Sequence, residues 1–333
     1  MSTDHSDLEP IEPNRAQELY LQHKQTECVE KTVRAHRSRT GHFVRWCDEQ
    51  DIENLNALTG RNLQEYRLWR QEDGDLKKIT LNQQMSTIRV FLKWCASVEA
   101  VPPNLYEKVM VPRVKPSEER CDETLDAETA ETALEYLEKY HYASVEHAVL
   151  SLLWETGIRL GAANSLDVED FDAVEERIDL RYRPDQGTQL KNGENGERPV
   201  ALSTDLSGML EDYVANVRED VTDDFGRNPL FSTVHGRMGR TTLRRIVYRT
   251  TAPCFRGEPC PDCASEKDSW KCGESVSPHA VRRGSITHFL SQDVPAEIVG
   301  DRMNVSRDVL DKHYDKRSEE VKLEQRRGYL ENI

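Results

Sequence analysis

The sequence predicts a mainly α-helical protein with a small β-sheet, an α+β fold divided into two domains. Apolar residues recur every three or four positions through most of the 333 residues, which is typical of amphipathic helices. Residues 113–126 are polar and lack this periodicity, so we expect them to form a linker between the domains. Alternating residues over 177–182 and a second extended stretch at 198–202 predict the strands of a small hairpin or meander.

The segment 10–112 is predicted to be a small helical domain. The pair Pro102–Pro103 ends its helical pattern, because proline lacks a backbone N–H and disfavours the helical conformation in the residue before it. Four or five helices are expected, and the clearest cover 13–22, 31–48, 61–71 and a long stretch that begins at Thr80.

The segment 127–333 is predicted to be a second domain, with helices on both sides of the hairpin. Asp126 or Thr129 has the side-chain oxygen that would cap its first helix. The stretch 148–156 is strongly apolar and predicts another helix. Further helices are expected from about Asp205, over 240–249, and onward to the end of the chain apart from a cysteine-rich region.

The chain carries 60 acidic and 45 basic residues, a formal net charge of −15. This balance is unusual for a DNA-binding protein, because non-specific affinity for DNA comes largely from lysine and arginine at phosphates. Two interpretations compete: the protein does not bind nucleic acid, or an acidic surface keeps it soluble while local basic patches bind DNA. Halophilic proteins use net charge in the second way, and the order of motifs in the second domain favours it.

The sequence predicts an intracellular, cytoplasmic protein with no membrane partner. No apolar run approaches the roughly 20 residues that a membrane-spanning helix needs. Residues 1–13 are acidic and polar, and they have neither the basic start nor the apolar stretch of a signal peptide.

Two basic runs are candidate DNA contacts. Each has helical spacing, so each is either an ordinary solvated helix face or a surface that contacts the phosphate backbone. Contacts of this kind position a duplex rather than specify its sequence. The candidate residues are Lys31, Arg34 and Arg37 in the first domain, and Arg237, Arg240, Arg244 and Arg245 in the second.

Four features with chemical potential follow one another in the second domain. They are Arg159 in the motif Thr-Gly-Ile-Arg, Lys191 in the turn of the predicted hairpin, His279 and Arg282 in the motif His-Ala-Val-Arg, and Tyr314 near the end of the chain. Each feature alone is weak, since surface arginines and packed tyrosines are common. Their shared order and spacing are far more specific.

Together these residues suit attack on a phosphodiester. Arginines can grip the non-bridging oxygens and stabilise the charge that builds on them. Histidine can accept or share a proton near neutral pH, and lysine can protonate a leaving 5′-oxygen. Tyrosine can form a covalent intermediate. A phosphotyrosine bond retains the energy of the broken phosphodiester, so resealing needs no ATP.

The order of these motifs resembles that of the tyrosine recombinases, also called phage integrases. By motif position, Arg159 and Arg282 match the two catalytic arginines of the family, and Tyr314 matches its nucleophile. Lys191 matches the hairpin lysine, and His279 matches the histidine of His-x-x-Arg.

The resemblance covers nearly the whole chain. It implies a SAM-like core-binding domain over 10–112 and a catalytic domain over 127–333. It also implies a site-specific recombinase that clamps double-stranded DNA, acts through a 3′-phosphotyrosine, and works as a homotetramer. No metal or nucleotide is implied for catalysis.

Two positions depart from the family pattern. Val305 stands where the family has a histidine or tryptophan that binds phosphate, and Ala162 stands where an acidic residue usually follows the first arginine. These departures keep a second hypothesis open: a degenerate integrase that occupies DNA without cutting it. A third is an enzyme like a type IB topoisomerase, which shares the chemistry but relaxes supercoils without a preferred sequence.

Four of the eight cysteines fall within 19 residues: Cys254, Cys260, Cys263 and Cys272. A Cys-x-x-Cys pair with two flanking cysteines resembles a structural zinc site, in which four thiolates would hold an otherwise poorly packed loop. The spacing is irregular for a zinc ribbon. The alternative is a loop with reduced thiols that bind no metal.

Overall fold

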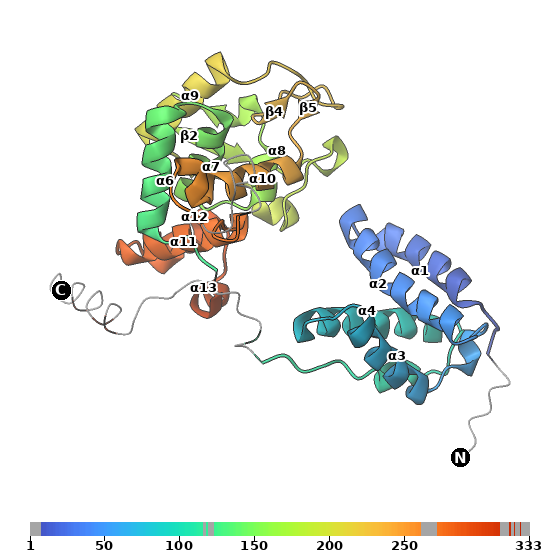
Figure 1. Ribbon diagram of the computed structural model, residues 1–333. Helices are drawn as coiled ribbons and strands as arrows, with labels where there is room; N and C mark the ends of the chain where they lie inside the picture. The colour runs from blue at the N-terminus through green and yellow to red at the C-terminus, as the bar shows by residue number, and fades with distance from the viewer. Residues whose placement is uncertain are drawn as a thin grey trace. The chain divides into compact units, whose positions relative to one another are not determined.

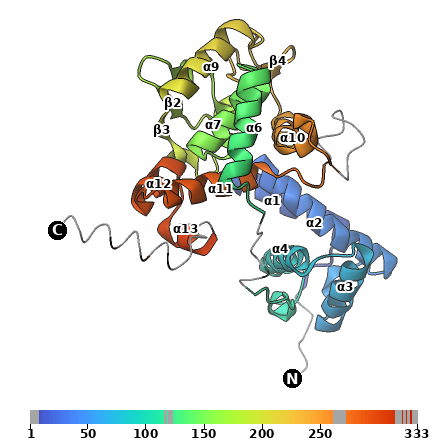
Figure 2. The ribbon, with the colours of Figure 1, turned by 60° about the vertical axis from the view of Figure 1, so that its left-hand side comes forward.

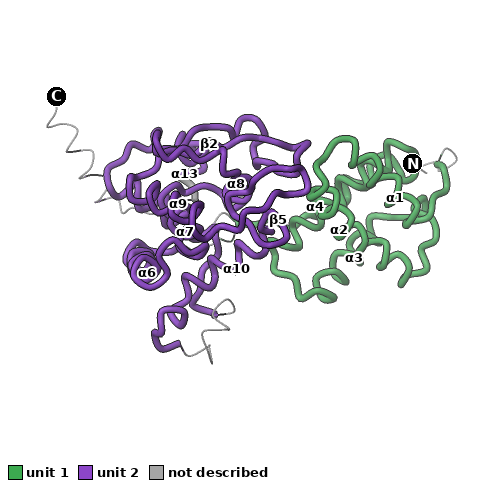
Figure 3. Tube along the Cα trace, turned by 90° about the horizontal axis from the view of Figure 1, so that it is seen from above, with its two compact units in different colours: residues 1–121 green, residues 122–333 purple. Residues whose placement is uncertain are grey.

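The computed structural model describes residues 8–115, 118, 123–260 and 272–313, together with the isolated residues 320, 323 and 327. The chain divides into two compact units, Met1–Cys121 and Asp122–Ile333 (Figure 3). Each unit has its own hydrophobic core, so each is described by itself.

The first unit is built from helices, as the sequence predicts (Figure 1). Thr59 caps the third helix through a reciprocal pair of hydrogen bonds with Asn62, which explains why the chain turns there. The helices are α1 (Pro13–Glu27), α2 (Glu30–Glu49), α3 (Gly60–Asp73) and α4 (Lys78–Ser97), with short 3-10 turns at η1 (Leu55–Ala57) and η2 (Leu105–Lys108).

Aromatic side chains fill the core of the first unit. Phe43 meets Tyr66 edge-on with ring centroids 5.0 Å apart, and Trp46 meets the same ring at 5.5 Å. Tyr20 and Phe91 extend the cluster between α1 and α4. These edge-to-face contacts add to the burial of large apolar surfaces, so the buried side of α2 is fixed and its basic side faces solvent.

The second unit is also mainly helical and contains two small sheets. The α+β prediction is therefore confirmed. Its first helix begins after Asp126, whose side chain accepts from the backbone N–H of Thr129 at 2.8 Å. The helices are α6 (Ala127–Tyr140), α7 (Val145–Thr156), α8 (Leu160–Ser165), α9 (Thr204–Asn216), α10 (Arg240–Thr251), α11 (Pro278–Ser291), α12 (Ala296–Met303) and α13 (Arg307–His313).

The predicted hairpin is part of a three-stranded antiparallel sheet in the order β1-β2-β3. Strands β2 (Arg177–Leu180) and β3 (Arg198–Ala201) pair with Ile178 opposite Val200, and both of these side chains are buried. Strand β1 (Phe171–Asp172) and the ribbon of β4 (Ser232–Thr233) and β5 (Gly236–Arg237) were not predicted. Strands of two residues are too short to give a periodic signal.

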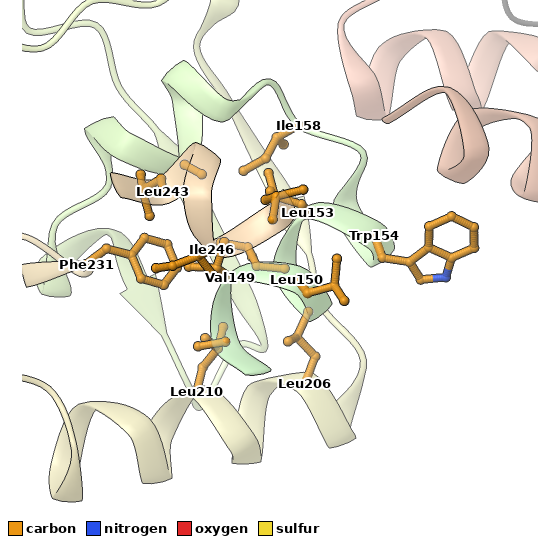
Figure 4. Close-up of a cluster of buried hydrophobic side chains, with 14 of the residues drawn as sticks. Val149, Leu150, Leu153, Trp154, Ile158, Leu206, Leu210, Phe231, Leu243 and Ile246 are labelled. Carbon is orange, nitrogen blue, oxygen red and sulfur yellow. The ribbon is translucent and has the colours of Figure 1, made fainter. Parts of the chain in front are cut away.

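Helix α7 is the centre of the second unit. In Figure 4 its side chains Val149, Leu150 and Leu153 meet side chains from α9 and α10, and all three are buried. This explains why the helix is apolar over a wide face rather than along one narrow stripe. Within the described residues no helix, α7 included, is both long and apolar enough to cross a membrane.

Gly157 ends α7 in the left-handed conformation, with φ of 57°. A Cβ atom at this position would lie 2.6 Å from the sulfur of Met303 at the end of α12. Both the backbone angle and the close approach therefore favour glycine. Helices α11, α12 and α13 lie together at the C-terminal side of the unit (Figures 1 and 2), and Gly157 brings them against the end of α7.

Replacement of Gly284 by alanine should destabilise the second unit. Gly284 lies within α11, and its Cβ would lie 1.9 Å from the carbonyl oxygen of Leu125. Because this atom belongs to the backbone, it cannot turn away, and we expect the free energy of unfolding to fall by about 1–3 kcal/mol or more.

The matched control is Gly208→Ala in α9, where a Cβ would meet nothing within 4 Å. That change should leave stability unchanged or raise it by up to ~1 kcal/mol, since glycine is unfavourable within a helix. Urea denaturation followed by circular dichroism measures both variants. Equal stability of the two variants would contradict the close packing of α11 on Leu125.

Candidate active site

Arg159 lies where the chain leaves the left-handed turn at Gly157. It precedes the first residue of α8 and is half-buried. Its Nη1 donates a hydrogen bond to the carbonyl oxygen of Asn304, 3.3 Å away. A main-chain acceptor therefore orients this guanidinium, which lacks the acidic side chain that the family pattern places at Ala162.

Arg282 is buried within α11, with 2 % of its surface exposed. Its Nη1 donates to the carbonyl oxygen of Gly157, and its Nη2 donates to that of Met303 at 2.9 Å. A buried charge is costly unless it is paired or hydrogen-bonded. Arg282 meets this requirement by joining the end of α7 to the end of α12.

A third arginine also binds the end of α12: Arg198, which was not singled out in the sequence. It begins β3, and its Nε donates to the carbonyl oxygen of Arg302 at 2.8 Å. Burial, followed by the charges of Arg282, Arg159 and Arg302, lowers the pKa of Arg198 to about 10. Its only sequence signal was its place at the start of a strand.

The three arginines share one short segment of backbone. Residues 302–304, here called the 302–304 turn, end α12 and lead towards α13. Its three successive carbonyl oxygens accept from Arg198, Arg282 and Arg159 in that order. Cations from β3, α11 and the start of α8 therefore all bind the 302–304 turn. This turn leads into α13, which ends directly before Tyr314.

His279 lies in the first turn of α11 and keeps an exposed surface. The pKa of its ring is nevertheless lowered to about 4. The largest cause is partial burial of the ring, and the second is the positive charge of nearby residues, namely Arg283, Arg282, Arg159 and Lys191. The imidazole is therefore neutral at pH 7 and able to accept a proton. These interactions place four of the five predicted catalytic residues in one electrostatic site.

Lys191 is exposed in the loop between β2 and β3. Two contacts hold this loop on the 302–304 turn: Asn192 Nδ2 donates to Asn304 Oδ1 at 2.8 Å, and Asn304 Nδ2 donates to the carbonyl oxygen of Asn195 at 3.0 Å. The predicted lysine is thus carried on a loop that is tied to the same turn as the arginines.

Val305, which departs from the family pattern, and Tyr314, the predicted nucleophile, come last along the chain. Val305 is buried and packs with Met303, Leu310 and other apolar residues of α11 and α12, so its side chain serves the core and offers a phosphate no hydrogen bond. Tyr314 lies outside the described residues, directly after α13 (Arg307–His313). Its role stays a prediction.

The hydrogen bonds of Arg237 argue against the prediction that it contacts DNA. A guanidinium has five N–H donors, and all five of Arg237 point inward. Nε and Nη2 donate to Asp223, Nη2 also donates to Asp167, and Nη1 donates to the carbonyl oxygens of Asn164 and Leu166. Arg237 is a structural residue that ties the β4–β5 ribbon to the chain after α8.

The other predicted DNA contacts are exposed. Lys31, Arg34 and Arg37 lie on the solvent side of α2, where Arg34 also pairs with Glu30 at 2.9 Å. Arg240, Arg244 and Arg245 lie on the exposed side of α10, and Arg240 Nε donates to Asn164 at 3.3 Å. Exposure is compatible with phosphate contacts, and these roles remain predictions.

Three of the four clustered cysteines come together. The sulfurs of Cys254, Cys260 and Cys272 all lie within 4.8 Å of one another, and the last two are 3.3 Å apart. Cys263 lies outside the described residues. The structure therefore collects three thiols that could share one metal ion.

Comparisons with known proteins match both units. Residues 18–98 match the family described as phage integrase, N-terminal SAM-like domain. Residues 123–320 match the family described as phage integrase family.

Curated relatives and solved structures agree with these matches. Tyrosine recombinase XerD of Pseudomonas aeruginosa is 23 % identical over 275 residues, which is 81 % of each chain. Tyrosine recombinase XerC of Natranaerobius thermophilus is 23 % identical over 252 residues, 73 % of each chain. A lambda integrase dimer bound to a COC′ core site has a TM-score of 0.67 at 13 % identity, over 95 % of this chain and 80 % of that one.

A second solved structure shares the fold. The Tn1549 transposon integrase in complex with a circular intermediate DNA has a TM-score of 0.65 at 13 % identity, over 96 % of this chain and 99 % of that one. At such low identity these two structures establish likeness of fold.

Arg237→Ala and Arg244→Ala should differ in their effects on stability and on DNA binding. The first breaks the partly buried ion pairs with Asp167 and Asp223, so the free energy of unfolding should fall, by at most the roughly 3–5 kcal/mol of a fully buried pair. The second removes an exposed cation from α10 and should leave stability unchanged. If α10 contacts phosphate, Arg244→Ala should weaken DNA binding and lower the slope of log affinity against log salt by about 1.

Thermal denaturation and fluorescence anisotropy with duplex DNA at several salt concentrations measure these two effects. A stable Arg237→Ala variant with weakened DNA binding would restore Arg237 as a DNA contact.

Proposed function

Since the chain belongs to the phage integrase family, we propose that it is a site-specific recombinase that breaks and rejoins DNA strands through Tyr314. The observation that carries this proposal is that Arg159 and Arg282 both donate to the 302–304 turn, which also holds the loop of Lys191. The charges of all three residues act on His279. The curated relatives, which match about three quarters of the chain or more, are named tyrosine recombinases.

The proposed reaction begins with attack of the Tyr314 hydroxyl oxygen on the scissile phosphorus. A bond forms between that oxygen and the phosphorus, while the bond from phosphorus to the 5′-oxygen breaks. The tyrosine proton passes to the neutral ring of His279, and the Lys191 ammonium gives a proton to the departing 5′-oxygen. Arg159 and Arg282 stabilise the charge on the non-bridging oxygens.

Rejoining reverses these steps. The 5′-hydroxyl of another strand gives its proton to Lys191 and attacks the 3′-phosphotyrosine, and His279 returns a proton to the tyrosine oxygen. One phosphodiester is exchanged for another, so the balance requires neither water nor nucleotide. The five residues suffice for this chemistry without a metal ion.

The domain roles and the assembly follow from this chemistry. Residues 10–112 would form the core-binding domain, 113–126 the linker and 127–333 the catalytic domain. Exchange between two duplexes requires four strand cleavages, and each copy of the chain has one Tyr314. We therefore propose a tetramer on double-stranded DNA, acting in the cytoplasm, with the exposed cations of α2 and α10 at phosphates.

Tyr314→Phe should abolish covalent DNA attachment while leaving DNA binding intact, because only the nucleophilic oxygen is lost. The probe is the duplex that the protein enriches from a random-sequence pool, nicked beside the cleavage position so that the released fragment diffuses away. Gel electrophoresis under denaturing conditions should reveal a protein–DNA adduct for the wild type alone.

Other outcomes separate the alternatives. Site-specific binding without an adduct from the wild type would identify a non-cleaving DNA-binding protein. Relaxation of supercoiled plasmid without any preferred sequence would identify a topoisomerase. An adduct from Tyr314→Phe would show that another residue is the nucleophile.

We also propose that the cysteine cluster holds one zinc ion. Tetrahedral zinc with sulfur ligands at about 2.3 Å places those sulfurs roughly 3.8 Å apart, which suits three sulfurs within 4.8 Å of one another. The distance of 3.3 Å between Cys260 and Cys272 is too long for a disulfide. Cys263 would be the fourth ligand.

The proposed role of this metal is structural. Cys254 lies in the 3-10 turn η6 (Pro253–Arg256), which follows α10, and Cys272 lies shortly before Ser277, the capping residue of α11. The backbone N–H of Val276 also donates to Thr251 in α10 at 3.1 Å. Zinc would thus fix the end of α10 to the start of the helix that carries His279 and Arg282.

Purified protein should contain one zinc ion per chain. Cys254→Ser and Cys272→Ser should lose the metal and lower the melting temperature by several degrees, as should a strong chelator on the wild type. Cys47→Ala, a buried cysteine of the first unit, is the control that should keep the metal. Metal-free protein with four freely titratable thiols and an unchanged melting temperature would refute the site.

A further inference from the structure

Asn304 ends α12 in the left-handed conformation, with φ of 51° and ψ of 64°. Glycine adopts this conformation without strain, and asparagine is among the few other residues that adopt it readily. Glycine at this position could therefore adopt the same backbone conformation. What asparagine adds is a side-chain amide.

Both ends of that amide contact the loop that carries Lys191. Asn304 Oδ1 accepts from Asn192 Nδ2 at 2.8 Å, and Asn304 Nδ2 donates to the carbonyl oxygen of Asn195 at 3.0 Å. These partners are more than 100 residues away in sequence. One of them, Asn192, is the neighbour of Lys191.

The main chain of Asn304 contacts the other side of the site. Its carbonyl oxygen accepts from Arg159 at 3.3 Å. A single residue thus touches the first arginine through its backbone and the lysine loop through its side chain. The far end of the loop is tied to the same turn by Arg198, which donates to the carbonyl oxygens of Gly196 and Arg302.

The loop needs such an anchor. Lys191 is exposed, and Gly193 has φ of 58°, so the local backbone includes a residue with wide conformational freedom. Proton transfer requires the lysine nitrogen within hydrogen-bond reach of the leaving oxygen. A displacement of about 1 Å can slow such a step by roughly 100-fold.

We infer that Asn304 is a positioning residue for Lys191: its side-chain amide holds the lysine loop beside the arginines and so sets how well the 5′-oxygen is protonated as it leaves. This inference rests on the proposed recombinase function and names the proton-transfer step that it controls. In that step the bond from phosphorus to O5′ breaks, and the proton of the Lys191 ammonium moves to O5′.

The test is Asn304→Gly, which keeps the left-handed backbone and removes both amide contacts. Two versions of the selected nicked duplex serve as probes: the ordinary phosphodiester and one with sulfur in place of the bridging 5′-oxygen. A thiol is far more acidic than an alcohol, with a pKa of about 8.5 in cysteine, so sulfur leaves without a proton from lysine.

Asn304→Gly should cleave the ordinary duplex about 10- to 100-fold more slowly than the wild type. On the sulfur-containing duplex its rate should return close to that of the wild type. Lys191→Ala should give the same pattern with a larger loss, and Asn192→Ala, which removes one of the two contacts, a smaller one. Arg159→Lys should be slow on both duplexes, since its defect is in stabilising the phosphate.

Asn216→Gly is the matched control, because Asn216 is an exposed residue at the end of α9, where the same substitution should change neither rate. Thermal melting of Asn304→Gly close to that of the wild type would exclude general unfolding as the cause. If Asn304→Gly cleaves both duplexes as fast as the wild type, or slows both equally, Asn304 does not position Lys191. If the wild type cleaves neither, the proposed function falls, and this inference with it.

Discussion

The hydrogen bonds of one buried guanidinium organise the second unit. Arg282 has almost no exposed surface, and it donates to the carbonyl oxygens of Gly157 and Met303. Because a buried charge without partners is strongly destabilising, the ends of α7 and α12 have to meet at α11. The left-handed turn at Gly157 makes this approach possible, and it is followed by Arg159, which donates to the next carbonyl oxygen along the chain, that of Asn304.

Two further groups of arginines, outside the candidate site, have different roles. One group faces inward: Arg183, Arg227 and Arg237 surround the buried carboxylates of Asp167 and Asp170 and so join the hairpin, α8 and the β4–β5 ribbon. The other group faces solvent on α2 and α10. A net charge of −15 therefore says little about affinity for DNA, because what matters is the local arrangement of the exposed cations.

The helices, the hairpin and the order of the candidate catalytic residues could be predicted from the sequence, because periodicity and motif spacing are local properties of a sequence. Arg198 and Asn304 were missed, since their partners at the 302–304 turn or on the lysine loop lie more than 100 residues away and leave no local pattern. The pairing of Arg237 with Asp167 and Asp223 was also missed, since a basic run looks the same whether its members face water or a carboxylate. The two-residue strands were below the length at which alternation can be seen.

The acceptors in the 302–304 turn belong to the main chain, and every amino acid supplies the same carbonyl oxygen there. Binding of the arginines to the turn therefore places little demand on its side chains, provided that position 304 tolerates the left-handed conformation. The contacts of the three arginines therefore do not depend on the side chains of the turn, whereas the packing of Met303 and the amide contacts of Asn304 do. The unusual Met-Asn-Val text is thus compatible with an intact catalytic framework, and a motif search that relies on side chains at these positions would overlook related proteins that keep it.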